Sequence, residues 1–183
     1  MTTNNVYSVD LDDFIFPFNE GFITFVNAQK GTSYTLDDLH DFRYDICLGG
    51  HISEWIDLIN AYVSSDDFRN IKPYPEAVTF LNELSKKGTI IACSARSKGL
   101  EEVTAHQLRQ TPQIKDFIHT LNKAGFLKSI GVKTHFDDAY HNVRDVHLEG
   151  IRGVLLHKNW NDKFFWVYKA KTHQDALLLG KYD

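Results

Sequence analysis

The chain has few cysteines, no long apolar run and no dense run of basic residues, and each absence excludes a class of protein. Only 2 of its 183 residues are cysteine. Cys47 and Cys93 show no CxxC spacing and are too few for a disulfide framework, so a reducing cytoplasm is the expected location. No segment approaches the roughly 20 apolar residues of a membrane-spanning helix, and we expect no membrane partner. The first residues lack a basic region followed by a long apolar one, so no signal peptide is expected.

The charge balance also excludes a broad class of partner. Twenty basic and 24 acidic side chains give a formal net charge of −4. Such a surface attracts the phosphate backbone of a nucleic acid poorly, so we expect no nucleic-acid polymer as a partner. A small anionic ligand in a local positive pocket remains compatible with this composition.

What the sequence does contain is a regular alternation of two hydrophobic periods, typical of one globular α/β domain. Short β-prone runs alternate with segments of helical periodicity, and this order predicts parallel βαβ units in a doubly wound sheet. The predicted strands are Val6–Val9, Thr89–Cys93, Phe117–Leu121, Val132–Phe136 and Gly153–Leu156. The predicted helices of this part are Pro75 to Leu84, Leu100 to Gln110, Lys123 to Ser129 and Tyr140 to Leu148.

Residues 18–72 break this alternation and carry only helical signals. We expect Asn19 to cap a first helix that ends at Gly31, Thr35 to begin a second and Ser53 to cap a third. A helical lobe inserted directly after the first strand would overhang the carboxyl end of the sheet, where ligands bind in this fold class. The sequence therefore predicts a core of residues 1–17 and 73–183 with a lid-like cap of residues 18–72.

Two acidic pairs follow predicted strands. Asp10 and Asp12 are two residues apart, so on an extended backbone their carboxylates point to the same side. Asp137 and Asp138 follow the Val132–Phe136 strand in the same way. Alone, Asp10 and Asp12 would favour an ordinary acidic turn after a strand, and Asp137 and Asp138 would fit a helix N-terminus as well as a functional site. The β-prone run Val6–Val9 before Asp10 favours a site for the first pair. Two acidic clusters at neighbouring strand ends repel each other unless they share a cation, and Mg²⁺ is the natural candidate.

Two further polar positions complete the pattern. Ser94 ends an apolar strand, and its hydroxyl together with backbone N–H groups at Ala95 could hold a phosphate oxygen, although a helix-capping serine is the common alternative. Lys123 lies fourteen residues before Asp137, which leaves room for one short helix and one strand. A solvated surface lysine is the usual alternative.

In this order, the four features resemble the haloacid dehalogenase-like (HAD) hydrolase superfamily. The resemblance runs from about Val6 to Asn161. Within the superfamily, the chain is similar to small cytosolic 5′(3′)-deoxyribonucleotidase-type phosphatases. The segments that carry the similarity are Val9–Asp13, Lys72–Ala77, Cys93–Arg96, Lys123–Gly125 and Phe136–Asn142.

The resemblance implies a role for each matched residue. Asp10 would attack phosphorus and become an aspartyl-phosphate, and Asp12 would protonate the leaving alkoxide and then deprotonate water. Ser94 and the backbone at Ala95 would bind the phosphoryl group, and Lys123 would neutralise it and orient Asp10. The residues implied as Mg²⁺ ligands are Asp10, Asp12 (through its backbone carbonyl), Asp137 and Asp138.

The sequence departs from its relatives at Asp13 and Phe14, where a small or β-branched residue is common. A third carboxylate there would disturb the charge of a metal site unless Asp13 turns outward. In the cap, Arg43 and Trp55 are candidates for substrate selection, although a surface ion pair and core packing are the more ordinary interpretations. The nine histidines match no metal motif, so we expect ordinary surface or loop residues.

The function expected from this pattern is a Mg²⁺-dependent phosphatase of a small phosphorylated metabolite, with a nucleoside 5′-monophosphate as one candidate substrate. A phosphatase of the same fold for a sugar phosphate or another metabolite is the near alternative. A protein that binds a phosphorylated ligand or a partner without catalysis is the alternative from another class. The oligomeric state is left open between monomer and homodimer. The run Phe164–Tyr168 predicts either an edge strand or an interface.

Overall fold

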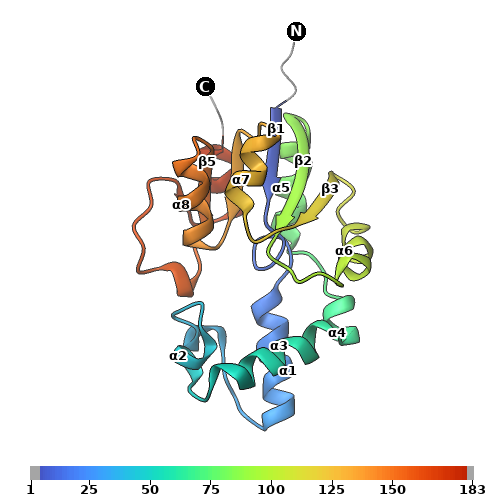
Figure 1. The fold of residues 1–183 in the computed structure, drawn as a ribbon, viewed down its shortest axis with the longest axis vertical. Helices are drawn as coiled ribbons and strands as arrows, with labels where there is room; N and C mark the ends of the chain where they lie inside the picture. Colours follow the sequence, from blue (N-terminus) through green and yellow to red (C-terminus); the bar gives the residue numbers. More distant parts are fainter. Residues whose placement is uncertain (1–4, 181–183) are drawn as a thin grey trace.

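The computed structural model describes residues 5–180, which form a six-stranded parallel sheet with helices on both faces (Figure 1). The strand order is β3-β2-β1-β4-β5-β6. The predicted doubly wound α/β fold with a helical insertion after the first strand is confirmed. The strands are β1 (Asn5–Val9), β2 (Gly88–Ser94), β3 (Ile114–His119), β4 (Thr134–Asp137), β5 (Arg152–Leu156) and β6 (Lys169–Ala170).

Alternating side chains of the strands supply two apolar layers, one on each face of the sheet. On β2, Ile90 and Ala92 belong to one buried cluster, and Ile91 and Cys93 to another. Helices α5 and α9 pack together over the first layer, and α7 and α8 pack together over the second. The bounds of these elements are α5 (Pro75–Ser85), α6 (Glu101–Leu108), α7 (Lys123–Ser129), α8 (Tyr140–Leu148), the 3-10 turn η2 (Asn159–Asn161) and α9 (His173–Leu179).

The sheet changes direction between β1 and β4. From β1 the chain adds β2 and then β3 on one side, and then crosses to begin β4 on the other side of β1. In open parallel sheets this reversal leaves a crevice at the carboxyl ends of the two central strands, and ligands bind there. The residues directly after Val9 and at the end of β4 therefore lie where a site is expected.

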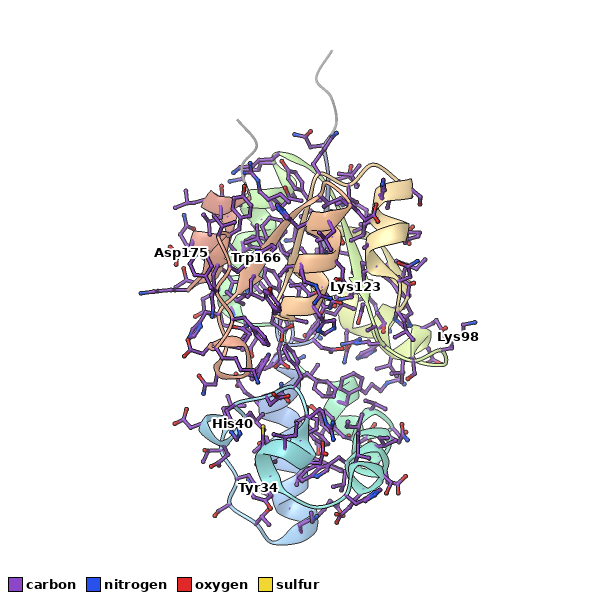
Figure 2. The ribbon with its side chains drawn as sticks, turned by 60° about the vertical axis from the view of Figure 1, so that its left-hand side comes forward. Tyr34, His40, Lys98, Lys123, Trp166 and Asp175 are labelled. Carbon is purple, nitrogen blue, oxygen red and sulfur yellow. The ribbon has the colours of Figure 1, made fainter. Side chains whose placement is uncertain are left out.

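Between β1 and α5 the chain forms a separate helical lobe, which lies below the sheet in Figure 1. Its apolar interior is built from aromatic side chains, and the rings of Phe22, Tyr62 and Phe68 contact one another through Tyr62. Figure 2 shows the side chains of the two lobes, with Tyr34 and His40 in the helical lobe and Lys123 in the sheet lobe. The lobe contains α1 (Phe18–Lys30), the 3-10 turn η1 (Leu36–Asp38), α2 (Tyr44–Leu48), α3 (Ile52–Val63) and α4 (Asp66–Arg69).

The chain leaves the helical lobe beside the point where it entered. The backbone N–H of Tyr74 donates to the carbonyl of Ile15 at 2.9 Å. Helix α6 holds the departing segment from the other side, because Gln107 donates to the carbonyl of Phe68 and Gln110 to that of Ile71. The two ends of the helical lobe are therefore held side by side by a short, hydrogen-bonded connection.

Several local predictions for the insertion are corrected. Helix α1 ends at Gly31, which has a φ of 66° and permits the left-handed cap, as expected. However, Pro17 and not Asn19 occupies the N-cap, and Asn19 lies in the first turn. His51 and not Ser53 caps α3, because its Nδ1 accepts the N–H of Ser53. The short helices α2 and α4 lack enough periodic positions to be predicted.

The end of the chain also differs from its prediction. Phe164–Tyr168 is irregular, and the edge strand β6 follows it at Lys169–Ala170. The third strand begins at Ile114, three residues earlier than predicted. The expectation of ordinary surface histidines is wrong for His135 and His173, which are both buried. Among the helices between residues 5 and 180, none is long and apolar enough to cross a membrane.

Candidate active site

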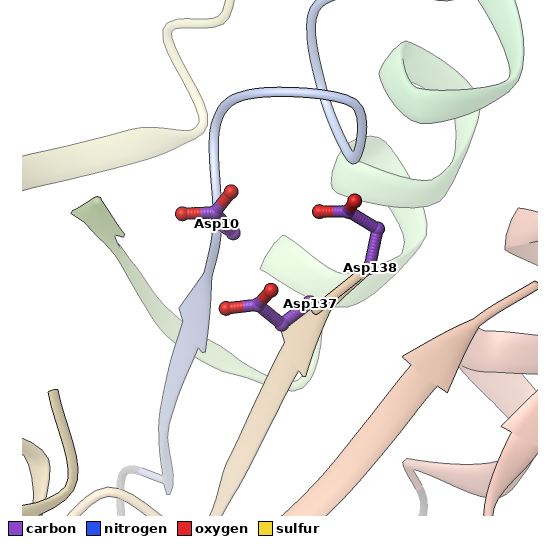
Figure 3. A group of neighbouring side chains, drawn as sticks. All are labelled: Asp10, Asp137 and Asp138. Atoms are coloured by element: carbon purple, nitrogen blue, oxygen red, sulfur yellow. The ribbon is translucent and has the colours of Figure 1, made fainter. Parts of the chain in front are cut away.

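Three carboxylates converge at the crevice between β1 and β4. Asp10 follows β1 directly, Asp137 is the last residue of β4, and Asp138 comes next. One carboxylate oxygen of each lies within 4.8 Å of the others, and all three residues are buried. Figure 3 shows the three side chains gathered at the ends of the two neighbouring strands. The predicted convergence of acids distant in sequence is therefore present in the fold.

Lys123 joins two of these carboxylates. Its Nζ lies 2.6 Å from Asp10 Oδ1 and 2.7 Å from Asp137 Oδ2, and its side chain is 3% exposed. The lysine is the first residue of α7, so the helix delivers it to the carboxyl end of the sheet. Burial alone would lower the pKa of Lys123, but the two carboxylates raise it above its ordinary value. The side chain is therefore a fixed cation at the site.

Asp137 is fully engaged by protein donors. Its Oδ2 accepts from Lys123, from His135 at 2.9 Å and from Asn142 at 2.9 Å, and its Oδ1 accepts the N–H of Ala139 at 2.7 Å. Burial alone would raise the pKa of Asp137, but Lys123 and His135 hold it below its ordinary value. Burial keeps the pKa of His135 low, so a neutral ring donates from Nε2. Asp137 thus acts as a permanent anion that orients Lys123.

Asp10 and Asp138 are less satisfied. Burial raises the pKa of Asp10 to about 7; Lys123 opposes this shift, and Asp137 and Asp12 add to it. Burial also raises the pKa of Asp138, with the charge of Asp137 as the next cause. Among residues 5–180, the Nε1 of Trp160 donates to Asp138 Oδ2 at 2.8 Å, and no hydrogen bond reaches the other oxygen. Both carboxylates retain acceptor capacity inside a cluster with excess negative charge.

This donor set fits a hard divalent cation. Mg²⁺ prefers oxygen ligands and is usually bound through one or two carboxylates and water. Asp10 and Asp138 would supply these carboxylates, while Asp137 is occupied with Lys123 and three other donors. A cation there would also offset the repulsion that raises the pKa of Asp10 and Asp138.

Asp12 and Ser94 line the same cavity as Asp10. Asp12 forms a two-point ion pair with Arg96, with Nη2–Oδ1 at 2.7 Å and Nε–Oδ2 at 2.9 Å. Ser94 ends β2, its side chain is buried, and its Oγ accepts the N–H of Arg96 at 3.3 Å. Ala95 also lines the cavity.

The two departures at positions 13 and 14 have a structural explanation. Asp13 does not turn outward: it is buried, lines the cavity and has a φ of 58°, in the left-handed region that aspartate tolerates better than most residues. Its carboxylate accepts two hydrogen bonds from Asn19. Burial raises the pKa of Asp13 to about 7, although Lys158 and the Asn19 N–H oppose this. Phe14 packs in the core against Phe80 and leaves the turn free.

A cavity of about 330 Å³ adjoins the acidic cluster and is lined by residues of both lobes. The sheet lobe supplies its charged and polar floor, and the helical lobe supplies a mostly apolar wall. Among the described lining residues, the lysine and arginine side chains are Lys123 and Arg96, and both are paired with carboxylates. The wall residues from the helical lobe are Phe18, Asn19, Leu39, Asp41, Phe42, Tyr44, Ile59, Asn60, Val63 and Phe68.

The two cap residues predicted to select substrate lie elsewhere. Trp55 is buried in the interior of the helical lobe, where its Nε1 donates to the carbonyl of Gly49. Arg43 is exposed and pairs with Asp45. Neither is among the residues that line the cavity, so the alternatives given above, core packing and a surface ion pair, describe them.

Four residues that contact the acids of the site had no assigned role in the sequence interpretation. His135 and Asn142 donate to Asp137, Trp160 donates to Asp138, and Arg96 donates to Asp12. Arg96 follows the strand-ending Ser94 by two residues, so its position in the loop after β2 could have indicated that it lies near the site. Trp160 lies in η2 after β5, and no periodicity connects it with Asp138.

Comparison with known proteins identifies the fold but does not identify the activity. No protein-family model matches the sequence, and no curated protein matches it either. Solved structures do match, and they include several haloacid dehalogenase-like hydrolases. At 8–16% sequence identity these matches show a common fold. The resemblance to haloacid dehalogenase-like hydrolases is thus confirmed for the fold, while the resemblance to 5′-nucleotidases stays a prediction.

Three of these structures illustrate the range of chemistry. One, from Lactobacillus plantarum and assigned as a phosphoglycolate phosphatase, is 13% identical, with a TM-score of 0.64 over 97% of this chain and 99% of the other. YfnB from Bacillus subtilis, a HAD hydrolase by assignment with bound magnesium, is 11% identical, with a TM-score of 0.63 over 94% and 96%. An L-2-haloacid dehalogenase is 8% identical, with a TM-score of 0.63 over 96% and 98%.

Proposed function

We propose that this chain, which has the fold of the haloacid dehalogenase-like hydrolases, is a Mg²⁺-dependent phosphatase of a small phosphate monoester. The observation that carries the proposal is the position of Asp10. Its carboxylate lies at the switch point of the sheet, 2.6 Å from Lys123 Nζ, beside a second carboxylate with acceptor capacity, Asp138. Phosphoryl transfer depends mostly on positioning and on charge neutralisation, and this arrangement offers both.

In the first step, an oxygen of Asp10 attacks phosphorus, the bond between phosphorus and the ester oxygen breaks, and Asp12 gives a proton to the leaving alkoxide. In the second step, water attacks the phosphorus of the aspartyl-phosphate, Asp12 takes its proton, and the bond to Asp10 breaks to release phosphate. Lys123, held by Asp137, keeps Asp10 in place and neutralises the phosphoryl oxygens together with donors from Ser94 and Ala95. Mg²⁺, held by Asp10 and Asp138, would supply further positive charge for an anionic ester.

The dehalogenase among the similar structures raises the alternative of halide displacement. A halide leaves without a proton, whereas an alkoxide requires one. Asp12 lies in the cavity with Asp10, where it can supply that proton. The acidic cluster, in which Asp138 retains acceptor capacity, also suits a divalent cation. A phosphate monoester needs such a cation more than a halocarboxylate does, because its anionic phosphoryl group is itself the site of attack. These features favour a phosphatase.

The apolar wall of the cavity supports a substrate whose leaving group is uncharged and bulky. The rings of Phe18, Phe42 and Tyr44 and the side chains on α3 can contact a base or another planar group. A nucleoside 5′-monophosphate has these properties and is our proposed substrate class. A sugar phosphate would use fewer of these contacts, and a non-catalytic phosphate-binding role would use them without turnover.

The test is Mg²⁺-dependent release of phosphate from p-nitrophenyl phosphate and from a panel of nucleoside and sugar monophosphates. We expect turnover that Asp10→Asn abolishes and that Asp57→Asn, the same change at an exposed carboxylate of α3, leaves intact. Absence of turnover of every ester by the folded, Mg²⁺-supplied protein would contradict the proposal and favour a binding role.

A further inference from the structure

Arg96 is a buried arginine that forms an ion pair with Asp12, a residue that lines the cavity. Its side chain is 3% exposed, while that of its partner Asp12 is 25% exposed. Nε donates to Asp12 Oδ2 at 2.9 Å, and Nη2 donates to Oδ1 at 2.7 Å. Two parallel bonds fix the plane of a carboxylate, which a single contact to a lysine would not do.

The guanidinium is itself held on its remaining sides. Nη1 donates to Thr104 Oγ1 at 2.9 Å and to Gln107 Oε1 at 2.6 Å, both on α6. Its carbon lies 5.0 Å from the centre of the Phe68 ring of α4. Each guanidinium nitrogen therefore already donates to a protein acceptor. This arrangement leaves Arg96 rigid and poorly disposed to bind a substrate phosphate itself.

We propose that Arg96 is the positioning residue of the reaction: it aims the Asp12 carboxyl group at the oxygen of the leaving group. This inference rests on the proposed function, in which Asp12 transfers the proton. Arg96 contacts neither ester nor metal in this role and acts only through Asp12. Because proton transfer depends steeply on geometry, a loosened Asp12 would slow the first step more for esters whose leaving group needs the proton than for esters whose leaving group does not. The second step is common to all esters, so kcat/KM, which reports the steps up to cleavage of the ester, is the quantity that separates them.

The test compares two aryl phosphates of similar size that differ in whether the leaving group needs a proton. The p-nitrophenolate of p-nitrophenyl phosphate leaves without protonation, whereas the phenolate of p-methoxyphenyl phosphate benefits from it. For Arg96→Gln we expect kcat/KM on p-methoxyphenyl phosphate to fall at least about 10-fold more than on p-nitrophenyl phosphate, within the range attributed to general acid catalysis. Equal losses on both esters would show a merely structural role and overturn the proposal.

Arg69→Gln is the matched control. Arg69 also links α4 with α6, through a surface ion pair with Glu102 at 3.2 Å, but it lies outside the cavity. We expect this variant to keep the wild-type ratio between the two esters. If Arg96→Gln fails to fold, Arg96→Lys replaces it, because a lysine keeps the buried charge but cannot bind both oxygens of Asp12. The same selective loss is expected.

A crystal structure of the Arg96 variant separates this inference from the proposed function. We expect the Asp12 carboxylate to leave its wild-type position in the Arg96 variant and to keep it in Arg69→Gln. An unmoved Asp12 would overturn the positioning role whatever the activity. If the wild-type protein hydrolyses neither ester, the proposed function fails, and the position of Asp12 still decides whether Arg96 sets its orientation.

Discussion

Asp13 binds Asn19 at two points: its Oδ1 accepts the backbone N–H at 2.9 Å, and its Oδ2 accepts the side-chain amide at 2.7 Å. Asn19 in turn accepts the hydroxyl hydrogen of Tyr44 on its Oδ1. A continuous hydrogen-bonded chain therefore runs from the loop after β1 through α1 to α2. The carboxylate acts as a cap for the first turn of α1, although it lies outside that helix.

We expect Asp13→Ala to reduce the free energy of unfolding by about 1–3 kcal/mol. Loss of a capping acceptor typically costs about 0.5–2 kcal/mol, and a φ of 58° is unfavourable for alanine by about 1 kcal/mol. Asp13→Asn keeps one acceptor and tolerates this backbone, so its loss should be smaller. Urea unfolding of both variants measures the difference. Equal losses would contradict this account, because they would show that neither the acceptor that asparagine retains nor its tolerance of the backbone contributes.

The acidic cluster predicts a response of stability to magnesium. Adding Mg²⁺ at about 100 times its Kd should stabilise the wild-type protein by about 2.7 kcal/mol. Asp138→Asn should lose this response, and in the presence of a chelator it should be at least as stable as the wild type, because one of three repelling carboxylates is gone. Thermal unfolding with and without Mg²⁺ checks both statements. Asp57→Asn should respond like the wild type, and a response retained by Asp138→Asn would argue against this site.

His173 predicts a pH dependence outside the metal cluster. Its ring donates from Nε2 to the carbonyl of Phe14 at 2.7 Å, and burial lowers its pKa below 6.5, although that bond opposes the shift. The folded protein therefore binds fewer protons than the unfolded chain just below pH 6.5, so this contribution is present above pH 6.5 and is lost as pH falls. Urea unfolding at pH 5.5 and 7.5 should show His173→Gln losing more stability, relative to the wild type, at pH 7.5. The same loss at both values would contradict this.

The apolar wall of the cavity predicts how the preference for a second anionic group on the substrate can be changed. Ile59 on α3 lines the cavity and is partly buried, and a lysine there would place a cation where the wall has none. We expect Ile59→Lys to improve kcat/KM for a bisphosphate over a nucleoside monophosphate by about 10-fold, which corresponds to about 1.4 kcal/mol. Ile56→Lys makes the same change on the exposed side of α3 and should leave the ratio unchanged. A similar ratio in both variants would show that this wall does not face the substrate.

Sequence periodicity predicted the sheet and its helices because the buried residues of strands and amphipathic helices recur at characteristic intervals in the sequence. Lys123–Ser129 and Tyr140–Leu148 agree with α7 and α8 at both ends. The acids of the site were found for the same reason, since each follows an apolar strand. The function of Asp137 was not resolved, because only the fold brings His135, Lys123 and Asn142 to its oxygens.

Other parts depend on contacts between segments that no local pattern records. Nothing in the sequence near Trp160 indicates that its indole reaches Asp138. Asn19 carries the side chain of a typical helix cap, but Pro17 occupies the N-cap, and Asn19 lies in the first turn, where it is the partner of Asp13. Helix α9 follows a loop and has few periodic positions, so only its capping box, from Thr172 to Asp175, was open to prediction.

The bond between Tyr74 and Ile15 brings together the two ends of a segment more than fifty residues long. A piece of chain whose ends adjoin can be lengthened, shortened or exchanged for another without breaking the layers beneath it. The four residues that we propose for the reaction, Asp10, Asp12, Ser94 and Lys123, all lie outside that piece. If the proposed function holds, exchange of this segment would change which substrates bind, while the residues proposed for bond cleavage stay the same.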